Sequence, residues 1–338
     1  MKRFSAFSVL TSPLARRFFR PLMRNRASIF FLHRQHAPHA GIHGHSVDFL
    51  RAALQALRDS GARFVSLRTM IEAWNLGRSV GPDWVAFTID DGFADQEILF
   101  REAFAPMDCP ATIFLISGFL DRHLWPWDDQ VAYVIRAAKD VQKTVELSGR
   151  PFVLDLTTAR GRAKTLESLR EHCKATSLLD PYEFVTRVAA AVEMQVPLAP
   201  PEEFRAMSWE TARSLERDGV DFGPHSISHR IFSRLSDADA RTELATSWQR
   251  LQAELKNPLP VFCWPTGRRA DFGARDMALA RELGLQAAVS TIPDFAHVRP
   301  ESRTDDLFAL NRFALPEAVD SVLRYGSWLE RGRQLLPV

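Results

Sequence analysis

The chain has 338 residues, a formal net charge of +2 and 46% hydrophobic residues. This length and composition are typical of a globular protein of enzyme size with one large core or two smaller ones. The near-neutral charge disfavours a nucleic-acid partner, because such proteins carry a strongly basic face. The three widely spaced cysteines predict no disulfide framework and favour a reducing compartment.

Residues 1–26 form a basic arm with seven lysines and arginines, and no acidic residue precedes Asp48. Aromatic and aliphatic residues alternate with the basic ones, as in Phe18, Phe19 and Leu22. We weigh two interpretations: an amphipathic arm that contacts an anionic membrane surface, and a solvated tail. No apolar run is long enough to span a bilayer. We therefore expect a cytoplasmic protein, peripheral at the inner membrane if the arm binds lipid.

The first half of the chain alternates short apolar strands with amphipathic helices. The predicted strands are residues 29–32, 85–89 and 111–115, and the predicted helices are residues 47–59 and 95–105. The second half repeats the pattern after residue 205. Its helices are predicted at residues 208–215, 237–255 and 274–283, and its strands at residues 220–223, 261–264, 286–290 and 308–313. Such alternation predicts an α/β fold with a parallel sheet or barrel.

Residues 124–205 interrupt this alternation with a mostly helical pattern and a proline-rich end at residues 196–201. We predict four parts: the basic arm (1–26), the first part of a barrel (27–123), a helical insertion (124–205) and the second part of the barrel (206–338).

Two adjacent carboxylates, Asp90 and Asp91, follow an apolar strand and precede Gly92. Neighbouring strand residues point to opposite faces, so both can face one site only if the chain bends there, and Gly92 permits a bend. A cation relieves the repulsion between two such carboxylates. His225 and His229 also follow a predicted strand, and we expect them on one face of a helical turn, where they can share a metal ion.

At these residues the chain resembles the polysaccharide deacetylase (NodB-homology) family of carbohydrate esterases. Residues 88–92 (Thr-Ile-Asp-Asp-Gly) are similar to its first motif, and 225–229 (His-Ser-x-x-His) to its second. Residues 262–267 (Phe-Cys-Trp-Pro-Thr-Gly) are similar to its third motif in the aromatic-Pro-x-Gly form. The resemblance covers about two thirds of the chain and implies a distorted parallel (β/α) barrel.

The resemblance implies a role for each matching residue. It makes Asp90 the general base, and Asp91, His225 and His229 the ligands of a divalent metal, with zinc the first choice. It places an oxyanion donor at the backbone amide near Thr266, and we expect Trp264 and Pro265 beside it to line the substrate pocket.

The chain departs from the family pattern in its third motif and near its end. Cys263 stands where many members have an arginine that orients the base, so we consider Arg312 and Arg268 as replacements. No histidine follows His297, although many members carry their general acid there. We offer His33, at the end of a predicted strand, as the general acid, with a structural histidine as the alternative.

Other aromatic and histidine residues have simpler interpretations. Trp125 and Trp127 either stack on a sugar or anchor the insertion, and we favour the anchor. The loop histidines are expected to be surface residues rather than a second metal site; they are His36, His39, His43 and His45.

The predicted function is metal-dependent removal of N-acetyl groups from an amino-sugar polysaccharide or its precursor. The alternatives are a catalytically lapsed saccharide-binding protein of the same fold and an acetyl-ester hydrolase. The sequence predicts neither the sugar nor the oligomeric state.

Overall fold

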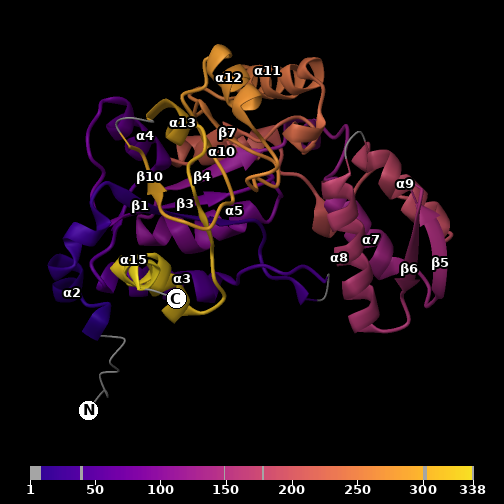
Figure 1. Ribbon diagram of the computed structural model, residues 1–338, viewed down its shortest axis with the longest axis horizontal. Helices are drawn as coiled ribbons and strands as arrows, with labels where there is room; N and C mark the ends of the chain where they lie inside the picture. The colour runs from indigo at the N-terminus through magenta and orange to yellow at the C-terminus, as the bar shows by residue number, and fades with distance from the viewer. Residues whose placement is uncertain (1–8, 39–40, 148, 177–178, 300–302, 337–338) are drawn as a thin grey trace.

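The computed structural model describes residues 9–38, 41–147, 149–176, 179–299 and 303–336 (Figure 1). A central sheet has the strand order β10-β1-β3-β4-β7, with β11 paired to β1 and β2 paired to β3. Its strands are β1 (Arg26–Leu32), β2 (Arg63–Phe64), β3 (Trp84–Ile89), β4 (Ala111–Leu115), β7 (Asp221–Pro224), β10 (Ala296–His297) and β11 (Phe313–Ala314). All pairs in it are parallel except β1 with β10.

A second parallel pair, β8 (Val261–Cys263) and β9 (Ala287–Val289), continues the curved wall beyond β7. The Leu259 amide donates to the Phe222 carbonyl on one side of the pair. Val289 forms a parallel bridge with Leu310 on the other side. The wall is therefore a distorted barrel whose strands are not all hydrogen-bonded to their neighbours.

Helices cover the outside of the wall. They are α3 (Val47–Asp59), α4 (Leu67–Asn75), α5 (Gln96–Leu99), α6 (Ser117–Leu120), α10 (Trp209–Arg217), α11 (Asp237–Glu254), α12 (Ala274–Glu282), α13 (Arg303–Leu307), α14 (Val319–Tyr325) and α15 (Trp328–Leu335). Helix α3 shows how the sequence sets its position: the Ser46 hydroxyl caps it, and Leu50, Leu54 and Leu57 line one face. No helix in the described part of the chain combines the length and apolar character needed to cross a membrane.

The strands are apolar on both faces because each face meets a different core. Phe30 and Phe87 pack with the α3 leucines, and their rings lie 5.5 Å apart. Ile29 and Ala86, one position along, belong to the cluster formed with β8 and β9. This arrangement explains the continuous apolar runs in the sequence, which are typical of buried parallel strands.

The insertion has a core of its own, which includes Val134, Leu169 and Phe184, and it lies beside the barrel in Figure 1. It contains α7 (Trp127–Ala137), α8 (Ala159–Ala175) and α9 (Pro181–Ala191) together with an antiparallel hairpin, β5 (Gln142–Leu147) and β6 (Arg150–Asp155). The hairpin was not predicted from the sequence. In the structure, burial alternates along β5, and Gly149 in the turn has φ +72°.

The strand predicted at residues 308–313 is wrong in extent, since only Phe313–Ala314 pairs with β1. Leu310 makes an isolated bridge, and the Arg312 amide donates to the Ile292 carbonyl. The chain leaves the ladder here, and the Arg312 side chain enters the barrel.

Candidate active site

The two carboxylates lie where β3 ends, and the backbone turns sharply between them. Asp91 has φ +88° and Gly92 has φ +87°. A Cβ atom on Gly92 would come within 2.9 Å of Leu115 and Leu120 side-chain carbons, so the backbone angle favours glycine and a larger residue would displace these leucines. The bend allows Asp90 and Asp91 to contact different partners within one buried site.

Asp90 forms a two-pronged ion pair with Arg312. The distances are 2.8 Å from Nη1 to Oδ1 and 2.7 Å from Nη2 to Oδ2, and neither residue is more than 2% exposed. Burial favours the neutral carboxyl, but the charge and hydrogen bonds of Arg312 outweigh it and hold the pKa of Asp90 below its ordinary value. Asp90 is therefore an ionised carboxylate at neutral pH.

The remaining donors of Arg312 are also satisfied. Nε donates to the Ser290 carbonyl at 2.8 Å, Nη1 to the Thr88 hydroxyl at 2.8 Å, and Nη2 to the Cys263 sulfur at 3.2 Å. Arg268, the other candidate for this contact, pairs with Glu171 at the surface instead, at 2.8 and 2.9 Å. Of the two arginines, only Arg312 contacts Asp90.

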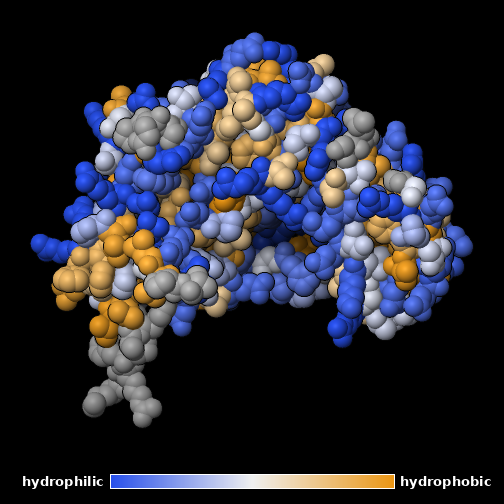
Figure 2. Space-filling model, in the orientation of Figure 1, coloured by the Kyte–Doolittle hydropathy of each residue, from blue (hydrophilic) through white to orange (hydrophobic). Residues whose placement is uncertain are grey.

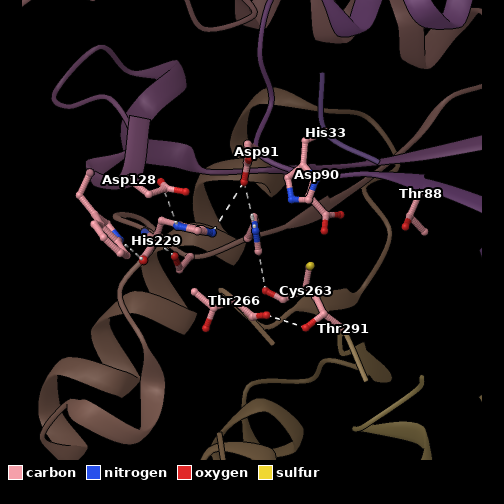
Figure 3. Close-up of polar contacts among 12 residues, drawn as sticks. His33, Thr88, Asp90, Asp91, Asp128, His229, Cys263, Thr266 and Thr291 are labelled. Atoms are coloured by element: carbon pink, nitrogen blue, oxygen red, sulfur yellow. Dashed lines mark hydrogen bonds and ion pairs between the residues drawn. The ribbon is translucent and has the colours of Figure 1, made fainter. Parts of the chain in front are cut away.

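Asp91 lies beside both histidines of the second motif (Figure 3). Its Oδ1 is 3.4 Å from His225 Nε2 and 3.7 Å from His229 Nε2. The ligand atoms of these three buried residues all lie within 4.8 Å of one another, so they could hold a metal ion. The His225 Nδ1 lies 2.7 Å from the Cys263 carbonyl, a contact that places its proton on Nδ1 and leaves Nε2 free as a ligand.

The two histidines lie on a loop, and the predicted helical turn is wrong. Ser226 and His229 have φ of +66° and +54°, which a right-handed helix does not allow. Glu243 of α11 holds the loop: its carboxylate accepts from the amides of Ile227 at 2.8 Å and Ser228 at 3.0 Å, and from the Ser228 hydroxyl. These bonds replace the hydrogen bonds that a helix would have supplied.

Three further residues support the site and were not predicted. Glu243 is one of them. Asp128, at the start of α7, has its carboxylate 4.0 Å from His229 Nδ1. The buried Gln96 amide donates to the backbone carbonyls of His33 at 2.8 Å and Asp90 at 2.5 Å. None of the three belongs to a short motif. In a structure, a buried Glu or Gln that faces a loop is a general sign that its side chain holds the loop by hydrogen bonds.

The third motif forms the floor of the site. Thr266 has φ +55°, its hydroxyl donates to Asp271, and its carbonyl accepts from Thr291 at 2.6 Å. Pro265 is buried. Trp264 is 1% exposed, stacks on Phe272 at 5.0 Å, and donates to the Phe308 carbonyl. Trp264 thus packs in the core, contrary to the expectation that it lines the pocket.

His33 is exposed and lies next to Asp90 in Figure 3, just beyond the end of β1. In the loop that follows, His36 and His43 are exposed, His45 contacts the Leu315 carbonyl at 3.0 Å, and His39 lies outside the described residues. In the described part of the chain, this loop supplies no group of residues able to hold a metal. Two of the four histidines, His36 and His43, are therefore surface residues as expected, whereas His45 is half-buried.

Trp125 and Trp127 are each 1% exposed, so they anchor the insertion, as we favoured. Trp127 donates to the His229 carbonyl at 3.2 Å and Trp125 to the Pro197 carbonyl at 3.1 Å. The first of these bonds connects the insertion directly to the loop that carries the histidines.

Comparison with solved structures finds the same fold in three bacterial deacetylases. PplD from Streptococcus pyogenes, solved with acetate, has a TM-score of 0.57 at 15% identity, over 89% of this chain and 98% of its own. IcaB from Ammonifex degensii has a TM-score of 0.55 at 13% identity, over 89% and 97%. A de-N-acetylase from Aggregatibacter actinomycetemcomitans has a TM-score of 0.51 at 13% identity, over 86% and 95%. These likenesses confirm the predicted distorted barrel.

Comparison with curated proteins finds no significant match. The family model described as polysaccharide deacetylase matches residues 77–288, which is more than half of the chain and includes all three motifs. The chain therefore belongs to the polysaccharide deacetylase family, as its motifs predicted.

Proposed function

We propose that this protein is a metal-dependent enzyme that removes N-acetyl groups from an amino-sugar polysaccharide or its precursor, with Asp90 as the base. The observation that carries the proposal is the buried Asp90–Arg312 ion pair next to the group of Asp91, His225 and His229. A binding protein without catalysis gains nothing from an ionised base held in this way, so the pair disfavours the lapsed enzyme.

The residues present fit a divalent cation. Asp91 Oδ1 is buried and has no hydrogen-bond partner among the described residues, which is costly unless a cation occupies the position. Two imidazoles and one carboxylate form a donor set typical of catalytic zinc, so we propose zinc held by Asp91, His225 and His229. Such an ion, when bound, polarises a carbonyl and makes water more acidic.

Asp90 takes the proton of the attacking water in this proposal. The positive charge of Arg312 stabilises the ionised form of this carboxylate. Hydrogen bonds from Arg312 to both carboxylate oxygens fix its orientation. The Thr266 amide, for which the described structure gives no hydrogen-bond partner, supplies an oxyanion donor. His33, exposed and beside Asp90, donates a proton to the leaving amine.

The decisive experiment measures acetate release from N-acetylglucosamine oligomers by zinc-reconstituted protein. We expect the wild type to release acetate, and Asp90→Asn to lose this activity while keeping its zinc. Asp48→Asn, a change at the exposed surface of α3, is the matched control and should be fully active. Zinc binding without acetate release from any N-acetylated saccharide would contradict the proposal, and release from O-acetyl sugars alone would favour the esterase.

His33→Ala tests the proposed acid separately. Turnover should fall steeply with unchanged zinc content, while His123→Ala, which removes an exposed histidine outside the site, should have no effect. Retained turnover in His33→Ala would remove this residue from the mechanism.

We also propose that the described part of the basic arm contacts an anionic membrane surface. Leu14 and Phe18 are 80% and 77% exposed. Figure 2 shows hydrophobic surface at the end of the molecule that carries the N-terminus. Arg16 anchors the arm: it is buried and donates to the carbonyls of Ser60 and Gly326. Residues 1–8 of the arm lie outside the described residues.

A further inference from the structure

A cavity of about 420 Å³ lies where the loop after β1 meets α7 and α8 of the insertion. Its size falls in the range of small-ligand pockets, roughly 300–1,000 Å³. Figure 2 shows the surface hollowed between the barrel and the insertion. The charged residues that line the cavity are Arg34, Asp129, Arg136, Arg162 and Arg170.

The cavity carries an excess of positive charge. Arg34 pairs with Asp95 at 2.9 Å, and Arg162 pairs with the exposed Asp140 at 2.8 Å. Among the described residues, neither Arg136 nor Arg170 has a carboxylate within 4.0 Å. Two guanidinium groups therefore lack a counter-ion.

Arg170 is held by hydrogen bonds, while Arg136 is exposed to solvent. Arg170 donates twice to the Asp128 carbonyl, at 2.7 and 3.2 Å. Arg136 is exposed and lies 5.6 Å from the Phe204 ring. Burial and the neighbouring Asp128 raise the pKa of Asp129 to about 8, so this carboxyl does little to neutralise the arginines at pH 7.

The cavity adjoins the active site. Asp129 lines the cavity, and its neighbour Asp128 has its carboxylate 4.0 Å from His229 Nδ1 (Figure 3). Arg34 follows His33 directly in the chain.

We propose that this cavity binds an anionic group, a carboxylate or a phosphate, of the saccharide whose N-acetyl group lies at the active site. Guanidinium groups bind both anions through paired hydrogen bonds. The inference rests on the proposed deacetylase function and narrows its substrate to acidic saccharides.

The test compares three ligands on zinc-loaded protein by titration calorimetry, with Asp90→Asn added to the wild type and to each variant so that no ligand is hydrolysed during the titration. They are the neutral N-acetylglucosamine tetramer, a tetramer that alternates N-acetylglucosamine with glucuronic acid, and N-acetylglucosamine 1-phosphate. The variants are Arg136→Gln and, as the matched control, Arg160→Gln, which removes an exposed arginine of α8 outside the cavity. The Arg136 side chain makes no hydrogen bond within the described part of the chain, so a variant with glutamine at this position should fold normally.

We expect the wild type and Arg160→Gln to bind at least one acidic ligand more tightly than the neutral tetramer. Arg136→Gln should lower this preference by about tenfold, which corresponds to about 1.4 kcal/mol. A loss confined to the glucuronate tetramer identifies a uronic acid, and a loss confined to the phosphate identifies a glycosyl phosphate.

Equal preference in Arg136→Gln and Arg160→Gln, or no preference in the wild type, would overturn the proposal. This titration measures binding alone. Absence of acetate release would therefore count against the proposed function without changing the outcome of the binding test.

Discussion

Arg312→Gln tests whether the site depends on a cation placed beside its base. The substitution removes the partner of Asp90 but leaves the carboxylate in a place where it is 2% exposed. Breaking a buried ion pair by removing one partner costs about 3–5 kcal/mol. We expect a loss of this size in the free energy of unfolding. The pKa of Asp90 should rise, because burial remains while the guanidinium is gone.

Urea denaturation of the metal-free protein measures the first effect in a double-mutant cycle of Arg312→Gln, Asp90→Asn and the double variant. The double variant should lose less than the sum of the single losses, by about 1–3 kcal/mol, because it removes both charges. Arg268→Gln is the matched control, since Arg268 is half exposed and pairs with a surface glutamate. Its loss should stay within about 0.5 kcal/mol.

The pH dependence of kcat/KM measures the second effect. The pKa of Asp90 is low in the wild type, so the base is ionised across the neutral range. In Arg312→Lys, which keeps the charge but loses the two-pronged contact, the acid limb should move to higher pH. The reasoning would be refuted if the losses in the free energy of unfolding were additive in the cycle and the acid limb of the kcat/KM profile did not move.

Three further predictions concern Glu243, Asp129 and the basic arm. Glu243→Ala should weaken zinc binding by about 10- to 100-fold, because the loop of His225 and His229 loses its anchor; unchanged affinity in a chelator competition would contradict this. Asp129 has a pKa of about 8, so the folded protein keeps a proton that the unfolded chain releases above about pH 4, and stability falls as the pH rises between these values. Asp129→Asn should flatten that slope in urea denaturation, and an equal slope would argue against it. The double variant Leu14→Glu/Phe18→Glu should no longer sediment with phosphatidylglycerol vesicles, and neither it nor the wild type should sediment with neutral phosphatidylcholine vesicles. Binding to phosphatidylglycerol that survives the change would show that the arm is not the membrane contact.

The fold and the centre of the site were accessible from the sequence for a physical reason. Buried parallel strands are short apolar runs, and their carboxyl ends meet at one edge of the barrel. Residues that directly follow such runs therefore come together, as Asp91, His225 and His229 do. The motif positions and the strand pattern each indicated, independently of the other, that these residues meet at one edge of the barrel.

The supporting residues could not be predicted in the same way. Glu243 lies in the middle of α11, where its polar side chain looks like part of a solvated helix face, yet it is 7% exposed. Asp128 belongs to the insertion, and only the packing of that insertion against the barrel brings it to His229. Their roles depend on how whole elements pack, which periodicity along the chain does not determine.

The third motif shows how the chain compensates for a change in its pattern. Cys263 is small, and its side chain leaves space at the base for a guanidinium that arrives from residue 312, on the far side of β9. Burial raises the pKa of the Cys263 thiol, so the neutral sulfur accepts a hydrogen bond without competing with Asp90 for the positive charge. Arg312 lies between Leu310, which bridges to β9, and Phe313, which pairs with β1, so its side chain enters the barrel at this point of the wall. Because the Arg312 guanidinium contacts both the Cys263 sulfur and the Asp90 carboxylate, the small residue in the third motif and the arginine from the last strand are two parts of one arrangement.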